Sequence, residues 1–493
     1  MMKPTHKTPD LRALLREHVP LEPEHELHAQ SLALLAEIEA ALDEADVKSG
    51  CAVLCGDSLD VLKTLPDNSV HAVVTDPPYG LGDTSPAQVA ECMLAWSQGL
   101  TWTPKGSGFM GKSWDAWVPP PELWREVLRV LKPGGHALVF AGSRTSDLMS
   151  LSLRLAGFEI RDTLQWLYGS GFPKSHNIDK AIDRALGAER EVIGTVKKSH
   201  CNNGDTVAWK GKVSQGRDPN SMDITAPATD AARAWEGWGT ALKPAYEPVI
   251  MARKPLKGTV VQNTLEHGCG GINVDGCRVG DEPRANGSWR NSSQDPVFPF
   301  GKNGSPKFTT ACIGRWPANV ILDPEAGALL DAQAGEPVSR FFYCPKASRA
   351  EREAGLQGHA TKTGAQPRAN IHPTVKPINL MRYLVRLVTP SHGTVLDPFA
   401  GSGSTGCAAV LERVNFVGIE RENEYARIAT ARINYWATQA QADAPQADTP
   451  QADQPQADTP QADTPQVPPT VHKTTRGARR KAPAEDDPQG SLF

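Results

Sequence analysis

Two short apolar runs in this chain each end in an aspartate that is followed by proline. Residues 70–75 lead into Asp76-Pro77-Pro78-Tyr79, and residues 394–396 lead into Asp397-Pro398-Phe399-Ala400-Gly401. An apolar, largely β-branched run of this length is typical of a strand that is buried on both faces of a parallel sheet. In open α/β sheets the ligand site lies at the carboxyl ends of the strands. We therefore expect one site built from two segments that are far apart in sequence.

Strand and helix signals alternate from Cys51 onward. Strands are expected at residues 52–54, 70–75, 136–141 and 160–167, and helices at residues 121–131 and 145–156. Residues 131–135, with the sequence Leu-Lys-Pro-Gly-Gly, are typical of a turn from helix into strand. The alternation predicts an α/β fold with a Rossmann-like, mostly parallel sheet and helices on both of its faces.

A glycine-rich loop follows the second apolar run. The motif Gly401-x-Gly403-x-x-Gly406 opens an expected helix, and Glu420 follows the next expected strand. Glycines let the backbone approach a nucleotide, and an acidic side chain after the next strand hydrogen-bonds ribose hydroxyls. The same spacing is the fingerprint of dinucleotide-binding proteins, so the loop by itself leaves a nicotinamide-dependent oxidoreductase open.

Together the two motifs resemble those of the amino-methylating DNA methyltransferases that use S-adenosylmethionine. Their order matches the permuted members, in which the catalytic tetrapeptide precedes the cofactor glycine loop. The element His372-Pro373-Thr374-Val375-Lys376-Pro377 resembles the segment that helps hold the methionine end of the cofactor, and residues 270–278 resemble a stretch of phage-type and prophage-type members. The resemblance implies a base-flipping enzyme with double-stranded DNA as substrate and S-adenosylmethionine as cofactor.

The resemblance also assigns two sets of site residues. The catalytic set is Asp76, Pro77, Pro78 and Tyr79, and the cofactor-binding set is Asp57, Thr374, Lys376, Pro377, Asp397, Pro398, Phe399, Gly401, Gly403 and Glu420. Asp397 is expected to meet the methionine ammonium, Phe399 to pack on the cofactor and Glu420 to bind the ribose. Asp57 is expected either near the cofactor adenine or, as ordinary local structure, at the N-cap of a helix that begins at Ser58.

The tetrapeptide suits chemistry on an exocyclic amine. The lone pair of such an amine is delocalised into the base, so the nitrogen is a poor nucleophile until acceptors hold its N–H bonds. The Asp76 carboxylate and the Pro77 carbonyl are the expected acceptors, and two rigid prolines fix them in place. A base inside a duplex has to be flipped out, and the ring of Tyr79, rather than its hydroxyl, is expected to stack on it.

We expect methyl transfer to the N6 amine of adenine by direct in-line displacement, because aspartate rather than serine precedes Pro-Pro-Tyr. The N4 amine of cytosine is the alternative, and the nicotinamide-dependent oxidoreductase is a remote one. The sequence carries no recognised nuclease motif, so restriction activity would need another chain.

The rest of the chain is divided by its patterns. Residues 1–50 are expected to form a helical arm that packs on the core or on a second copy in a homodimer. The other expected segments are residues 51–173, the catalytic half of the core; 174–240, an inserted loop without secondary structure that closes over DNA; 241–255, a core strand; 256–340, a target-recognition region; 341–436, the cofactor-binding half; and 437–493, a disordered tail.

Composition is consistent with a soluble protein of the cytoplasm of a bacterial or phage-infected cell. The net charge is −4, but basic residues outnumber acidic ones between about residues 197 and 315, with Trp209, Trp235, Trp238, Trp289 and Trp316 interleaved. Such a surface suits DNA phosphates and bases. The nine cysteines form no Cys-x-x-Cys pair, so neither disulfides nor a zinc site at Cys269 and Cys277 is expected. No apolar run is long enough for a membrane span.

The C-terminal tail contains a pentapeptide repeated five times between Gln441 and Pro465 and ends in Gln489-Gly490-Ser491-Leu492-Phe493. The repeats cannot bury enough apolar surface to become ordered, so they are expected to act as a tether. The last five residues resemble the Gln-x-x-Leu-Phe peptides that dock bacterial polymerases and repair proteins on the sliding clamp.

Deletion of Leu492 and Phe493 is expected to abolish binding to the sliding clamp and to leave methylation of short naked duplexes unchanged, because these side chains are the apolar anchors of the tail. Binding of a peptide spanning Pro488 to Phe493 to the purified clamp of the host tests this. No binding at about 100 μM, well above the micromolar strength of a few buried anchors, would contradict it.

Overall fold

The computed structural model describes residues 50–82, 85–106, 108, 113–169, 171, 175–197, 221–288, 307–343, 349–357, 369–372 and 374–442. Several predicted features lie outside these residues. They are the N-terminal arm up to residue 49, Trp209, Trp289, Pro373, and the tail from residue 443 with Gln489, Leu492 and Phe493.

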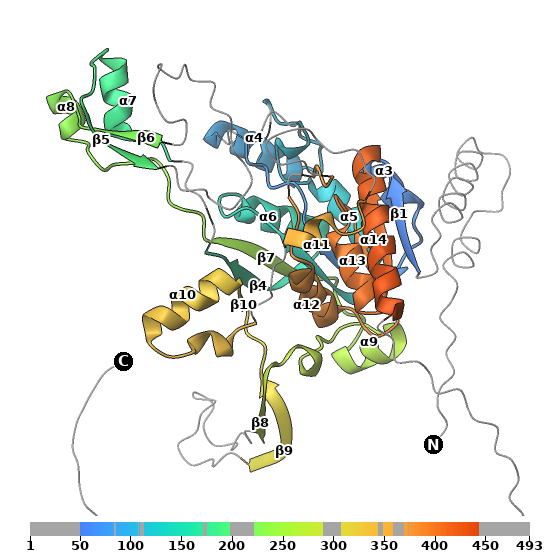
Figure 1. Ribbon diagram of the computed structural model, residues 1–493. Coiled ribbons are helices and arrows are strands. Elements are labelled where there is room, and N and C mark those ends of the chain that lie inside the picture. The colour runs from blue at the N-terminus through green and yellow to red at the C-terminus, as the bar shows by residue number, and fades with distance from the viewer. Residues whose placement is uncertain are drawn as a thin grey trace, which may run out of the picture. The chain divides into compact units, whose positions relative to one another are not determined.

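The core is an eight-stranded sheet with the strand order β1-β12-β11-β2-β3-β7-β4-β10. Its strands are β1 (Cys51–Cys55), β2 (Val70–Thr75), β3 (Leu131–Phe140), β4 (Glu159–Leu167), β7 (Tyr246–Arg253), β10 (Val320–Leu322), β11 (Thr394–Asp397) and β12 (Asn415–Glu420). Only β7 runs antiparallel to its neighbours in this sheet. The predicted mostly parallel, Rossmann-like sheet is confirmed (Figure 1).

Helices cover both faces of the sheet. The helices that flank it are α3 (Ser58–Thr64), α5 (Pro121–Val130), α6 (Ser146–Ala156), α12 (Ile378–Val388), α13 (Ser404–Leu411) and α14 (Asn423–Ala442). Along β2, Val73 packs with Leu62, Trp124 and other residues of α3, α5 and α6, whereas Ala72 and Val74 pack with α12 and α13. Side chains of a strand alternate between faces, so a continuous apolar run is what a strand covered on both faces requires.

Pairing of β2 with β11 brings the two predicted motifs together. The strands are parallel neighbours, with Val395 opposite Ala72 and Leu396 opposite Val73. The loops that begin at Asp76 and after Asp397 therefore leave the sheet from the same edge.

The predicted turn at residues 131–135 differs from the structure. Leu131 already pairs with Val70, and the pairing resumes with His136 opposite Ala72, so the segment between them is an irregularity inside β3. Gly134 adopts a positive φ of 75° there, a conformation that favours glycine. Its amide donates to the Lys254 carbonyl, which keeps the irregular segment attached to the end of β7.

The expectation that residues 174–240 lack secondary structure is wrong for the described part. This segment contains α7 (Ile178–Ala185), β5 (Val192–Lys197), β6 (Ser221–Thr225) and α8 (Asp230–Arg233), and β5 and β6 form an antiparallel pair of their own.

The region at residues 256–340 contributes both to the central sheet and to elements outside it. It contains α9 (Val260–His267), the antiparallel pair of β8 (Val279–Ser288) and β9 (Lys307–Arg315), and α10 (Pro324–Ala334), but its β10 belongs to the central sheet.

A buried ionic cluster holds the inserted module α7-β5-β6-α8 together. Arg190 donates to Asp179 at 2.7 Å and to Asp183 at 2.5 Å. Asp183 is fully buried and also accepts from the Thr229 hydroxyl at 2.8 Å and from the amides of Ala228 and Thr229. The cluster thus joins α7 to the segment that leads into α8.

The remaining described α-helices are α4 (Pro86–Ser97) and α11 (Arg349–Glu353), and the 3-10 turns are η2 (Ser113–Asp115), η3 (Asp275–Cys277) and η4 (Val338–Phe341). Across the ranges that the structure describes, no helix combines the length and apolar character needed to cross a membrane.

Replacement of Arg190 by Met is expected to loosen the inserted module alone, because loss of one partner leaves buried carboxylates without compensation. Hydrogen exchange at the amides of α7 and β6 should accelerate at least tenfold, of the order that follows from losing one buried charge partner, with exchange in β2 and β11 unchanged. Arg184→Met, at an exposed position of α7, is the matched control and should leave exchange unaltered. Equal exchange in the two variants would refute the role of the cluster.

Candidate active site

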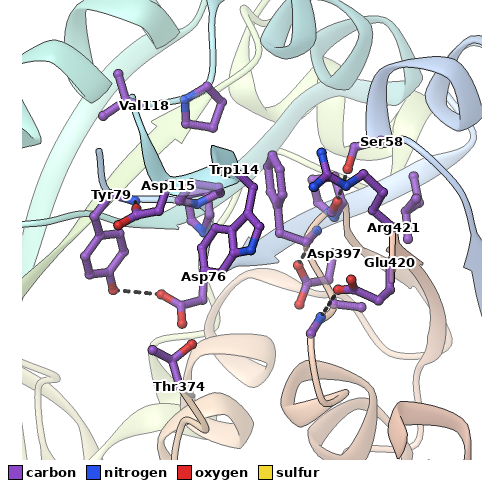
Figure 2. Close-up of a pocket in the computed structure, with 18 of the residues that line it drawn as sticks. Ser58, Asp76, Tyr79, Trp114, Asp115, Val118, Thr374, Asp397, Glu420 and Arg421 are labelled. Atoms are coloured by element: carbon purple, nitrogen blue, oxygen red, sulfur yellow. Dashed lines mark hydrogen bonds between the residues drawn. The ribbon is translucent and has the colours of Figure 1, made fainter. Parts of the chain in front are cut away.

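A cavity of about 520 Å³ lies at the sheet edge where the loops after β2 and β11 meet. Every predicted site residue except Pro377 and Gly403 lines it. In the view of Figure 2, Tyr79 and Asp76 lie on one side, Asp397 and Glu420 lie on the other, and Trp114 stands between them. The cavity therefore has two parts, one around the tetrapeptide and one around the glycine loop.

Two residues that the sequence did not single out fix the tetrapeptide. The buried Asp115 accepts from the amides of Tyr79 and Gly80 through its Oδ1, at 2.9 and 3.0 Å. The Thr145 hydroxyl donates to the Tyr79 carbonyl at 2.5 Å. The backbone after the two prolines is thus held from both its N–H and its C=O side, which leaves little freedom for the acceptors of the tetrapeptide.

A polar network of four side chains lies on the tetrapeptide side of the cavity. The Tyr79 hydroxyl lies 2.7 Å from Asp76 and 2.9 Å from Glu247, and its one proton can be donated to either carboxylate. The Lys376 ammonium lies 2.8 Å from the second oxygen of Asp76, 3.1 Å from Glu247 and 3.1 Å from the Tyr79 hydroxyl. In Figure 2 a dashed line joins the Tyr79 hydroxyl to the Asp76 carboxylate.

This network adds contacts that the sequence did not predict. Lys376 was expected on the cofactor side, but its ammonium contacts the carboxylate of the tetrapeptide. The Tyr79 hydroxyl was expected to be dispensable, yet it is the hydrogen-bond partner of both carboxylates and of the ammonium. The hydroxyl of Tyr79, and not only its ring, is therefore part of the site.

The surroundings of Lys376 and Tyr79 fix the protonation states of these two hydrogen-bond donors. Burial alone would lower the pKa of Lys376, but the carboxylates of Asp76 and Glu247 outweigh it and raise the pKa above its ordinary value. Burial, followed by the same two carboxylates, raises the pKa of Tyr79 well above its ordinary range. Near neutral pH, Lys376 is therefore a cation and Tyr79 a neutral hydrogen-bond donor.

Asp397 is the buried acid of the second part. It accepts from the Thr75 hydroxyl at 2.7 Å, the Thr405 hydroxyl at 2.6 Å and the Phe399 amide at 3.1 Å. Burial raises its pKa to about 6, although these hydrogen bonds oppose the shift. Phe399 also packs near Trp124, with ring centroids 6.4 Å apart, so an apolar face adjoins the acid.

The glycine loop passes closely under its neighbours. Gly401 has a φ of 52°, and a Cβ there would come within 2.8 Å of the His372 ring. Gly403 has a φ of 76° at the N-cap of α13, and a Cβ there would lie 2.9 Å from the Ala429 backbone. The positive φ and the close neighbour both require glycine at each of these positions. Burial lowers the pKa of His372 to about 4, so this ring is neutral.

Glu420 closes the loop from β12. Its carboxylate accepts from the Gly401 amide at 2.9 Å and from the Glu422 amide at 2.8 Å, and burial raises its pKa. Asp57 is the N-cap of α3, where it accepts from the Leu59 amide at 3.0 Å, and it also lines the cavity. Thr374 lines the cavity from the segment before α12, and Pro377 is the N-cap residue of that helix.

Cysteines and carboxylates in the described part form no metal centre. Within those residues, no group of three or more His, Cys, Asp or Glu side chains is placed to hold a metal ion. Cys269 and Cys277 are both buried, and their thiols contact the carbonyls of His71 and Tyr383.

Comparison with known proteins decides the family. The family described as DNA methylase matches residues 70–431, which is well over half of the chain and includes both motifs. The chain belongs to this family. The expected S-adenosylmethionine-dependent DNA methyltransferase is thereby confirmed, and the oxidoreductase alternative is set aside.

Individual relatives of the methylase agree with this assignment. It is 25% identical to the type II methyltransferase M.HindIII of Haemophilus influenzae over 405 residues, which cover 76% of this chain and 93% of the relative. It is 34% identical to the type II methyltransferase M2.LlaDCHI of Lactococcus lactis over 115 residues, or 22% of this chain and 42% of that protein.

Solved structures match the methylase over most of its length at low sequence identity. The M1.HpyAVI-SAM complex is 16% identical, with a TM-score of 0.32, and the match covers 78% of this chain and 98% of that one. The PvuII DNA methyltransferase (cytosine-N4-specific) is 14% identical, with a TM-score of 0.38, and the match covers 80% and 93%. The family assignment thus rests on the sequence matches.

Proposed function

We propose that this DNA methylase transfers a methyl group to the N6 amine of adenine in flipped-out bases of double-stranded DNA. The observation that carries the proposal is the tetrapeptide, which the structure holds rigidly at the edge of a cavity shared with the glycine loop. The N4 amine of cytosine is the alternative, because it has the same N–H geometry.

The cofactor side of the cavity suits S-adenosylmethionine in its donor set. Asp397 offers a carboxylate to the methionine ammonium, Glu420 offers one to the ribose hydroxyls, and Phe399 offers an apolar ring. Gly401 lines the cavity, where a backbone without a side chain can approach the ligand closely, and Gly403 lets the loop pack against Ala429. When bound, S-adenosylmethionine supplies the methyl group on a sulfonium sulfur, which keeps the electron pair of the broken bond.

The residues of the tetrapeptide side then act on the base. Asp76 and the Pro77 carbonyl accept the N–H bonds of the amine, which localises its lone pair on nitrogen. The nitrogen forms the new bond with that pair and is positively charged until it loses a proton, for which Asp76 is the acceptor. Tyr79 stacks on the base, while its hydroxyl holds Asp76 in place.

Other surfaces are proposed to serve the DNA and its machinery. Trp235, Trp238 and Trp316 are all exposed, at 45%, 59% and 62%, in the regions predicted to contact DNA. We infer that these surfaces bind DNA, that Gln489, Leu492 and Phe493 recruit the enzyme to a sliding clamp, and that the N-terminal arm contributes to a homodimer.

Asp76→Ala is expected to lower turnover by at least about a hundredfold, the order seen when one preorganised polar group is lost, with the affinity for S-adenosylmethionine unchanged within a few-fold. Wild-type enzyme incubated with amplified, methyl-free bacterial DNA should yield N6-methyladenine, measured by mass spectrometry of the nucleosides. N4-methylcytosine as the product would replace adenine by the alternative, and near-normal turnover of the variant would refute the role of Asp76.

Cofactor affinity is expected to fall as the pH drops below about 6. The pKa of Asp397 in the free protein is raised to about 6, and a bound ammonium favours the ionised acid, so binding must displace a proton below that pH. Calorimetry should show affinity roughly tenfold weaker at pH 5 than at pH 7.5, as linkage requires. Asp397→Asn should bind weakly at both pH values. A wild-type affinity that is independent of pH would contradict the assigned partner.

A further inference from the structure

Glu247 occupies an unusual place on the sheet. It lies near the amino end of β7, opposite Trp166 at the carboxyl end of β4. Because β7 is antiparallel to its neighbours, its beginning rather than its end reaches the edge where the active site lies. A carboxylate is thereby delivered to the tetrapeptide from a strand that would otherwise contribute nothing there.

The charges around Glu247 do not balance. Among the residues that the structure describes, Glu247 and Asp76 share one cation, the Lys376 ammonium, at 3.1 and 2.8 Å. The lysine side chain is 8% exposed, and the carboxylate side chains are 23% and 18% exposed, so water screens them only partly. Two carboxylates and one ammonium leave one negative charge in excess. The faces of Phe140 and Tyr79, 4.8 and 5.4 Å from the ammonium, add no counter-charge.

An excess negative charge in a partly buried cavity raises the free energy of the resting protein. A positive charge that arrives there during function compensates it. In the proposed reaction a positive charge develops on the amine nitrogen beside Asp76. A preorganised field aimed at developing charge is usually a large term in catalysis. The imbalance is therefore the feature expected of a site built for the transition state rather than for the resting protein.

We propose that Glu247 is the second carboxylate of the target-amine site: it positions Lys376 and Tyr79 on Asp76 and, with Asp76, gives the site the excess negative charge that stabilises the methylated amine. Glu247 touches the partners of Asp76 and so acts through them as a positioning residue. This inference rests on the proposed amine methylation and extends it to the residue that sets the charge of the site.

Four enzymes test the charge balance: the wild type, Glu247→Gln, Lys376→Met and the double variant. The net charge of the cluster is −1, 0, −2 and −1 in that order. Single-turnover transfer of tritiated methyl groups to amplified, methyl-free bacterial DNA should be about a hundredfold slower in Glu247→Gln. Its dissociation constants for S-adenosylmethionine and DNA should stay within about threefold of the wild type, because the charge of Glu247 acts on the positive charge that develops in the transition state rather than on the neutral base.

The double variant distinguishes charge from packing. Restoring the net charge of −1 should make it at least about fivefold faster than Glu247→Gln, a coupling ordinary for residues in contact. Glu247→Asp keeps the negative charge and shortens the side chain, so it should lose less activity than Glu247→Gln. Glu159→Gln removes a carboxylate that pairs with Arg253 at the opposite end of the same strands, and it should transfer at the wild-type rate.

Two results would overturn the inference about Glu247 without contradicting the proposed function. One is a Glu247→Gln variant that transfers methyl groups within about threefold of the wild-type rate. The other is a double variant as slow as, or slower than, Glu247→Gln, which would make the lysine and the glutamate merely structural partners. A wild-type enzyme that methylates no amine in DNA would instead overturn the proposed function itself.

Discussion

The parallel pairing of β2 with β11 is the constraint on which the active site depends. The register that sets Ala72 against Val395 places Asp76 and Asp397 at one edge of the sheet, although more than three hundred residues of sequence separate their strands. Burial of both faces of β2 fixes that register, since a slip of one residue would exchange the side chains that face the two helical layers. The Thr75 hydroxyl then ties the strand ends together by donating to Asp397.

Opposite electrostatic conditions exist in the two parts of the cavity. Around Asp397, burial favours the neutral acid and hydroxyl donors only partly compensate. Around Asp76, a shared ammonium and a phenol hold two carboxylates within a few ångströms. One part is thus ready to gain a cationic group from a ligand, and the other carries its charge before any base arrives. The same sheet edge supports both because separate loops and strands supply the partners.

The sequence was most informative where a strand leads directly into the chemistry. The apolar runs before Asp76 and Asp397, and the glycines at 401 and 403, predicted the sheet and most of the cavity lining. Glu247 was predicted only as part of a core strand, because its proximity to Lys376 follows from the antiparallel insertion of β7, which a one-dimensional pattern does not reveal. Asp115 sits in a 3-10 turn with no periodicity, and the inserted module consists of elements too short for a clear period.

The inserted module enters and leaves the core at one place. Asn177 and Gly239 bridge its two ends, and the Tyr168 amide donates to the Ala245 carbonyl just outside them. These contacts hold the two ends of the module together, so insertions or deletions between them leave the register of β4 and β7 unchanged. The module can therefore be lengthened, shortened or replaced without a change in the pairing of the catalytic sheet.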